Sequence, residues 1–223
     1  MVHQRAIQNI LSAAGAEIIP PCQYDFPSRN TTQFLALGRM LSSVGVGAAL
    51  ALADEVSALD PELVSGLASI AATEARHSAF FEVASGQVPN PSPFDTPVAG
   101  VWAYNLALNF IVPGSCPVSP PFQIIPTLTA SAEEGTTIWS FSWDPTQEPV
   151  VREAGRPLFI AWVNQLGSPI YAELSLTSNG TGTAQIPQGM EGAVFAALTS
   201  QGSLTTTDEL AGSTLAGPAL VMP

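Results

Sequence analysis

Lysine is absent from this sequence of 223 residues, and only six basic side chains, all arginine, oppose 18 acidic ones. Without lysine, the chain has neither a Schiff-base residue nor the lysine of a phosphate-binding loop. The formal net charge of −12 excludes nucleic acids and anionic membrane surfaces as partners, because both repel an acidic protein.

Histidine and cysteine are scarce as well, with two residues of each. His3 and His77 both fall in predicted helices, so a Ser-His-Asp or Cys-His hydrolase site lacks a free base. Cys22 and Cys116 each lie beside a proline in a loop-like context. They form either a disulfide, which would join the loop before the second helix to the second half of the chain, or two unpaired thiols.

Long apolar runs are also missing. The two longest, at 44–53 and 98–112, are interrupted by polar residues or glycine or are too short to span a bilayer, so we expect no membrane span. The N-terminus lacks the apolar segment of a signal peptide, yet the low charge and two N-glycosylation sequons, at Asn30 and Asn179, are typical of extracellular proteins. We expect a secreted protein whose printed chain is mature, trimmed or incomplete.

What the first half does contain is helical periodicity, at 2–14, 32–57, 60–86 and 96–111. Asn30 or Thr31 is predicted to cap the second helix, Asp60 to start the third and Thr96 or Asp95 to cap the fourth. Gly86 is predicted to end the third helix. Short connections make the second and third helices an antiparallel hairpin.

The third helix carries a seam with spacings of three and four residues, formed by Leu63, Leu67, Ile70, Glu74, His77 and Phe81. A carboxylate and an imidazole on an inward face are costly unless they are paired or bind a metal. The Glu-x-x-His spacing is the one with which di-iron helix bundles present ligands. Alternatively, a Glu–His pair, a Glu74–Arg76 pair or buried water satisfies Glu74 and His77.

Period-two alternation with frequent turn signals replaces the helical pattern after Cys116. Strands are predicted at 124–131, 136–143, 158–166, 170–177, 182–186, 194–199 and 215–221. The fold class is therefore α+β, with a helical domain at 1–116 followed by an antiparallel β-sandwich domain at 117–223. Trp139 and Trp143 share one face of their strand and either fill the core or stack against carbohydrate.

Several motifs, in this order, resemble the ferritin-like domain of fungal and bacterial desiccation- and stress-related secreted proteins. They are the Pro-Cys-Gln-Tyr-Asp-Phe-Pro segment at 21–27, Val-Gly-Val-Gly-Ala at 44–48, Glu-Ala-Arg-His at 74–77, Pro-x-Pro-x-Pro-Phe-Asp-Thr-Pro at 89–97, Phe-Ile at 110–111 and Cys-Pro at 116–117. Fungal members add a β-rich C-terminal region that ends in a segment similar to Ala-Gly-Pro-Ala at 216–219.

The resemblance implies a four-helix bundle that has lost its first helix and most of its metal ligands. Glu74 and His77 match one Glu-x-x-His pair, and His3 matches the histidine of the other, whose Glu would precede Met1. Ser42 occupies the place of the central helix's Glu. We therefore expect no di-metal centre, with at most a single divalent ion on His3, Glu74 and His77.

The function expected from this resemblance is that of a secreted, stress- or development-associated protein with a degenerate site, non-enzymatic and acting in binding or structure. The alternatives are a metal-dependent oxidoreductase of the di-iron type and a carbohydrate-binding module in the β half. Because a truncated bundle exposes an apolar helix, a homo-oligomer that completes the bundle is the expected partner.

Overall fold

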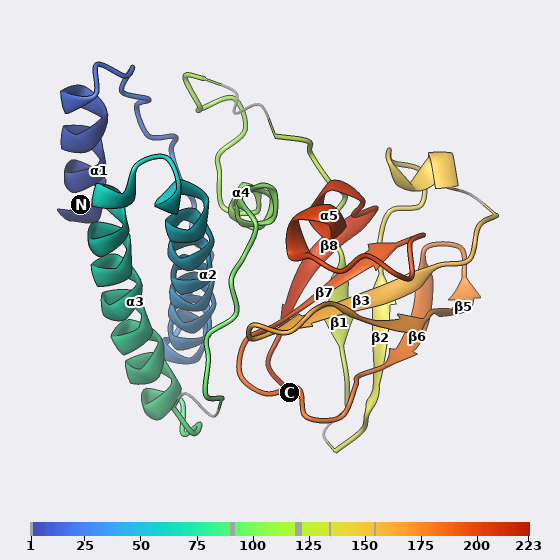
Figure 1. Cartoon of the computed structure of the whole chain (residues 1–223). Helices are drawn as coiled ribbons and strands as arrows, with labels where there is room; N and C mark the ends of the chain where they lie inside the picture. The colour runs from blue at the N-terminus through green and yellow to red at the C-terminus, as the bar shows by residue number, and fades with distance from the viewer. Residues whose placement is uncertain (1, 90–91, 119–121, 134, 154) are drawn as a thin grey trace.

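The computed structural model describes residues 2–89, 92–118, 122–133, 135–153 and 155–223. Figure 1 shows the arrangement as a series of layers, with α3 outermost, then α2, then α4, and then two β-sheets. The expected α+β class is confirmed: helices come first, and two antiparallel four-stranded sheets follow. Asn90 and Pro91 of the proline-rich motif lie outside the described residues.

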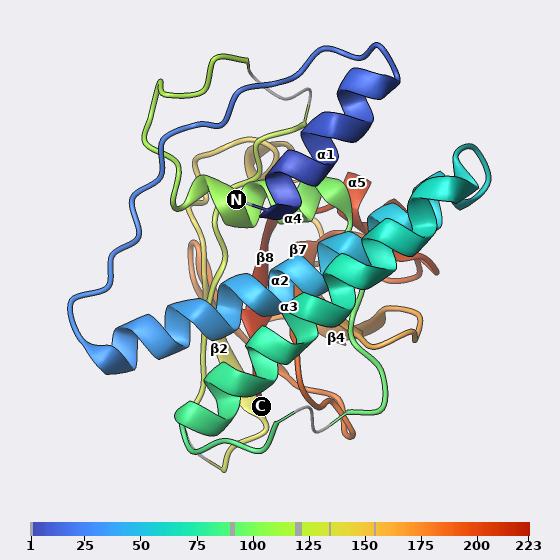
Figure 2. The same ribbon diagram turned by 90° about the vertical axis from the view of Figure 1, so that its left-hand side faces the viewer.

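Three helices form the outer layers: α1 (Val2–Ala13), α2 (Thr31–Ser57) and α3 (Val64–Ala84). The predicted hairpin of α2 and α3 is confirmed, and in Figure 2 the two helices run side by side in front of the sheets. None of the residues of α1 is buried. This helix therefore contributes little to the core.

The helix ends show which local signals are decisive. Of the two predicted caps of α2, Asn30 is the one in the structure, where its side chain accepts a hydrogen bond from the Gln33 amide (2.9 Å). Gly86 has a φ of 75° just beyond α3, the left-handed conformation expected after a helix end. The predicted start of α3 is displaced, because Pro61–Leu63 forms a 3₁₀ turn and Asp60 makes no side-chain cap.

The fourth helix, α4 (Gly100–Leu108), is shorter than predicted. Thr96 does not cap it; its hydroxyl donates to the Ala193 carbonyl (2.6 Å) and accepts from the Gln165 amide (2.7 Å). The Val98 amide donates to the Gly47 carbonyl of α2 (3.0 Å). Tertiary hydrogen bonds thus hold the residues before α4 extended, and Asp95 or Thr96 as a cap was wrong.

The β half is a sandwich of two sheets. One has the order β1-β2-β6-β5, formed by Thr129–Ser131, Ile138–Ser142, Thr181–Gln185 and Ser175–Ser178. The other has the order β4-β3-β7-β8, formed by Ile170–Glu173, Phe159–Asn164, Val194–Thr199 and Ala216–Val221. All pairings within both sheets are antiparallel.

Three details of this half differ from the sequence prediction. The strand predicted at 170–177 is split into β4 and β5, which belong to different sheets. The strand expected at 124–131 shortens to β1. A helix, α5 (Thr207–Gly212), was missed, although Thr206 and Glu209 have the spacing of a capping box and form one.

Two apolar cores meet on the second sheet. Phe141 and Trp143 from the first sheet pack with Ile160, Trp162 and other inward side chains of the second. The other face of the second sheet is covered by α4 and α5, so every residue of β7 is buried. A strand buried on both faces reads as a continuous apolar run, which explains why β7 shows no alternation.

The contacts of α4 bind the helical half to the β half. Trp102 of α4 is fully buried, and its Nε1 donates to the Thr214 hydroxyl (2.9 Å). The Asn105 amide donates to the Gln123 carbonyl (2.9 Å) and its Oδ1 accepts from the Ile125 amide (2.7 Å). The division at residue 116 stays a prediction, but α4, on its N-terminal side, shares a core with the second sheet.

Among the described residues, α2 is the one helix long and apolar enough to cross a membrane, judged by length and composition alone. The central helix of a folded domain and a signal sequence have the same property. Large apolar side chains nevertheless stay exposed on the helical layers: Val2, Ile7, Ile10, Phe34, Leu41, Leu52, Phe80 and Val83. The outer side of the helix pair is therefore incompletely covered.

Candidate functional site

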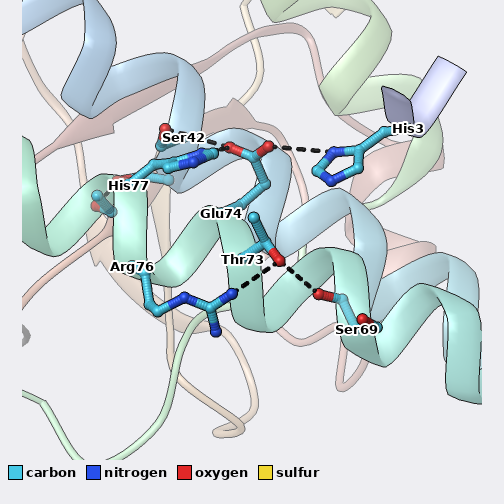
Figure 3. A network of polar contacts seen from close by, with 9 residues as sticks. His3, Ser42, Ser69, Thr73, Glu74, Arg76 and His77 are labelled. Atoms are coloured by element: carbon cyan, nitrogen blue, oxygen red, sulfur yellow. Dashed lines mark hydrogen bonds and ion pairs between the residues drawn. The ribbon is translucent and has the colours of Figure 1, made fainter. Parts of the chain in front are cut away.

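Glu74 on α3 is the centre of the polar network drawn in Figure 3. Its Oε2 lies 3.3 Å from the His77 Nδ1, and its Oε1 lies 3.4 Å from the Nδ1 of His3 on α1. Residues three apart on a helix are neighbours on its surface, which brings Glu74 and His77 together locally. His3 comes from a distant part of the chain, and the tertiary fold brings it into contact with Glu74.

The wall opposite Glu74 is formed by α2. The Ser42 hydroxyl donates to Glu74 Oε2 (3.3 Å), and the side-chain carbons of Glu74 lie over Gly45. One turn further along α3, the hydroxyls of Ser43 and Ser78 are 3.2 Å apart. α2 therefore presents the Ser42 hydroxyl and Gly45 to Glu74, and this stretch of α2 supplies no carboxylate.

Arg76, the other candidate partner of Glu74, points elsewhere. Its guanidinium donates to the Thr73 hydroxyl (3.1 Å), which in turn donates to the Ser69 carbonyl (3.0 Å). The Glu74–Arg76 pair is thus wrong, and the Glu–His alternative describes the structure. The prediction of an inward seam holds only in part: the Glu74 side chain is 22% exposed, whereas His77 is 53% exposed.

This geometry lets one carboxylate bind two imidazoles. Each histidine directs Nδ1 at Glu74, so a neutral ring that donates from Nδ1 keeps Nε2 as its acceptor. Ser42 adds a third donor to the same carboxylate. The two imidazoles and the Ser42 hydroxyl together satisfy the half-buried charge of Glu74, as partly buried carboxylates require.

A comparison with known protein families finds a match in the helical half of the chain. The model of the ferritin-like domain matches residues 1–87. The N-terminal helical region is a ferritin-like domain. No curated protein matches the sequence. The matched segment contains α1, α2 and α3 together with His3, Glu74 and His77, and it ends before α4 and the sheets.

Ferritin-like proteins with a di-metal centre use a Glu on each of two helices and a Glu-x-x-His on each of the other two. The donor set around Glu74 does not fit that centre, because one carboxylate and two imidazoles are present and α2 presents Ser42. Within the described ranges, no group of three or more His, Cys, Asp or Glu side chains is placed to hold a metal ion. We derive no metal chemistry from this site.

A cavity of about 260 Å³ lies on another side of α3, between the helix pair and the 192–193 loop. Ala75, Arg76 and Ser78 line it, whereas Glu74 and His77 do not. Asp95 also lines it, and desolvation by burial raises the pKa of the Asp95 carboxyl. The polar network around Glu74 and this cavity are thus separate features of the helix pair.

The two tryptophans proposed to stack on sugars have different environments. Trp143 is 8% exposed and belongs to the core between the sheets, because alternation along β2 turns it toward the second sheet. It therefore presents no open stacking face. Trp139, nearer the end of the sandwich, is half-buried, packs edge-on against Trp162 (6.4 Å between ring centroids) and lines a cavity of about 770 Å³.

Cys22 and Cys116 form a disulfide across a sequence separation of 94 residues. The bond joins the loop before α2 to the loop after α4, next to the bridge between Tyr24 and Ile111. Of the two alternatives that the sequence allowed, the structure has the disulfide. The two sequon residues, Asn30 and Asn179, are both exposed.

Proposed function

We propose that this chain is a secreted, stress- or development-associated protein whose ferritin-like domain acts in binding or structure rather than in metal redox chemistry. The observation that carries the proposal is the set of partners of the Glu74 carboxylate, which are His3, His77 and the Ser42 hydroxyl, so that α2 presents a serine where a di-metal centre needs a carboxylate. A redox di-metal centre needs bridging carboxylates from several helices.

Secretion is supported by the covalent chemistry of the chain. Both cysteines are in the disulfide, and such bonds persist in oxidising compartments. Exposed sequons at Asn30 and Asn179 fit the same compartment.

The metal content of the protein purified from medium containing iron, manganese and zinc tests the proposal. We expect less than one bound iron or manganese per chain by elemental analysis, and no dioxygen consumption when Fe²⁺ is added. A single zinc or other divalent ion that disappears in both Glu74→Gln and His77→Ala would identify adventitious binding at the remnant. Two iron or manganese atoms per chain, lost together in Glu74→Gln, would instead establish the di-iron oxidoreductase.

The partner we propose is a second copy of the chain, seated on the exposed apolar side of α2 and α3. Phe34 (54% exposed) and Phe80 (65% exposed) would be covered by such a contact. A self-complementary contact uses the same surface on both copies, as most homodimers do. Sedimentation at micromolar concentration is expected to show a dimer that dissociates in Phe34→Ser/Phe80→Ser, while a monomeric wild type would refute it.

A carbohydrate-binding role of the β half is the second candidate, and the cavity at Trp139 favours it. Apolar residues including Ile186, Met190 and Met222 surround the half-buried tryptophan, and exposed Gln185, Gln188 and Glu133 stand around them. An apolar floor with a few polar groups at its edge is the usual composition of a small-molecule site.

A glycan array separates binding here from simple core filling by Trp139. We expect a recognised glycan to be lost in Gln188→Ala, whose side chain is exposed and outside both cores. Trp139→Phe, which keeps an aromatic ring against Trp162, is expected to weaken binding without unfolding the protein. Absence of binding to any glycan by the wild type would reject this second function.

A further inference from the structure

The hairpin that carries the second sequon borders a cavity of about 440 Å³ in the β half. Its lining residues include Pro145, Leu158 and Leu176, together with Asn179 itself. Leu176 is 61% exposed, although it lies on a strand beside this cavity. An apolar surface of this size thus lies next to one of the two side chains to which an N-glycan would be attached.

The position of Asn179 over the cavity is fixed by its turn. Gly180, with φ 83°, follows Asn179 between β5 and β6, and its carbonyl accepts from the Trp143 amide (2.9 Å). A Cβ at position 180 would lie 2.7 Å from the Trp143 carbonyl, so only glycine permits this approach. The hairpin is therefore held against the segment that follows β2.

The Asn179 amide itself is free to carry a sugar. It is exposed and makes no hydrogen bond among the described residues, whereas Thr181 of the sequon bonds to the hydroxyls of Thr177 (2.8 Å) and Ser178 (2.7 Å). Asn-x-Thr in an exposed turn of a secreted protein is the standard acceptor for N-glycosylation.

We propose that this cavity seats the first sugar of an N-glycan on Asn179, an inference that rests on the proposed secretion. An N-acetylglucosamine ring has an apolar face of C–H groups, which would cover Leu176 and Pro145. Its acetamido group and hydroxyls would face the rim, where the Arg156 guanidinium pairs with Glu153 (3.1 Å). The glycan thereby acts as a covalently attached part of the fold.

Asn30 supplies an internal comparison. Its side-chain oxygen caps α2 through the Gln33 amide, and it lines none of the cavities described above. A sugar there would lie over none of these cavities. We therefore expect a glycan on Asn30 to leave the folded state no more stable, whereas the first sugar on Asn179 raises its stability.

The test uses the full chain secreted from a eukaryotic host, in a Thr32→Ala background that removes the first sequon and leaves the Asn30 cap intact. Three forms are compared: the complete glycan on Asn179, a single N-acetylglucosamine left by an endoglycosidase, and Asn179→Gln. We expect the first two to melt together, roughly 2–4 °C above the third, the shift that a modest stabilisation produces in a chain of this size.

A second variant locates the contact. Leu176→Ser is expected to abolish the difference between the single-sugar form and Asn179→Gln, and nuclear Overhauser contacts are expected from the C–H protons of the sugar ring to Leu176. The matched control, removal of the Asn30 glycan by Thr32→Ala alone, should leave the melting temperature unchanged.

Absence of a glycan on Asn179 in the secreted protein overturns the inference, as does a single-sugar form that melts with Asn179→Gln. Neither result bears on the metal content around Glu74. Failure of the glycan seat and failure of the proposed function are therefore told apart in the same preparation.

Discussion

Two glycines of the α2–α3 pair show how much a single residue depends on what surrounds it. A Cβ on Gly47 would lie 2.5 Å from both the Thr96 carbonyl oxygen and the Val98 Cγ2. A Cβ on Gly66 in α3 would meet nothing within 4 Å. Both glycines lie in helices, so the local sequence gives no reason to expect different surroundings. The surroundings differ because the chain segment before α4 packs against Gly47.

We predict opposite effects of alanine at these two positions. Gly47→Ala should destabilise the protein by about 1–3 kcal/mol, because the added methyl group displaces the segment that donates from Val98 to Gly47. Gly66→Ala should stabilise it by about 0.5–1 kcal/mol, because alanine loses less backbone entropy in a helix. Urea unfolding of both variants checks this, and equal effects of the same sign would contradict it.

At the scale of an element, α5 depends on its cap. The Thr206 hydroxyl accepts from the Glu209 amide (3.2 Å), and the Glu209 carboxylate accepts from the amides of Thr205 and Thr206 (3.2 Å each). Leu210 of this short helix is fully buried against the second sheet. The cap therefore holds in place a helix that covers part of the core.

Removing the cap should loosen α5 without unfolding the sandwich. We predict that Thr206→Ala costs about 1 kcal/mol of stability, the usual effect of losing an N-cap side chain. Hydrogen exchange of the Leu210 and Ala211 amides should accelerate, while the amides of β7 keep their protection. Thr205→Ala, which leaves the Thr206 cap in place, is the control and should have the smaller effect.

The same carboxylate makes α5 sensitive to acid. The backbone amides of Thr205 and Thr206 that donate to Glu209 hold its pKa below the ordinary value of 4.5. Because the folded pKa is lowered, this contribution to stability is present above pH 4.5 and is lost as the pH falls through the folded pKa. Glu209→Gln should flatten that part of the stability curve between pH 5 and pH 2, measured by urea unfolding; a curve identical to wild type would count against it.

At the scale of the whole molecule, α4 and the disulfide link segments that lie far apart in the chain. α4 packs on the second sheet through Trp102, and the Cys22–Cys116 bond fixes the long connection from α1 to α2 against the end of α4. Phe34 of α2 and Phe80 of α3 nevertheless stay exposed. The helix pair is thus covered on the side of the sandwich, whereas these two aromatic side chains stay exposed.

Loss of the disulfide should be the most costly covalent change. Cross-linking residues 94 apart removes chain entropy from the unfolded state, which amounts to about 4–5 kcal/mol in the chain-entropy model. Cys22→Ser/Cys116→Ser is therefore expected to unfold at much lower urea concentration. Reductant should lower the midpoint of the wild type toward that of the double variant and leave the variant itself unchanged.

Much of the fold follows from local sequence. Asn30 caps α2, Gly86 ends α3, and the strand at Val194–Thr199 has its predicted bounds, because short-range sterics and hydrogen bonds determine these features. The Glu-x-x-His spacing likewise places Glu74 beside His77. Sequence motifs of this range also sufficed to identify the ferritin-like domain that the family comparison finds at 1–87.

Tertiary structure decided the rest, because periodicity says which side of an element is apolar but not what covers it. The partners of Glu74 on α1 and α2 are 71 and 32 residues away in the chain, so no local pattern could specify them. The single strand predicted at 170–177 became two strands in two sheets, and Trp143 became part of the core between those sheets. The sequence by itself determined a ferritin-like helix pair and a β-sandwich; packing of the distant elements alone determined that Glu74 binds side chains of its own protein.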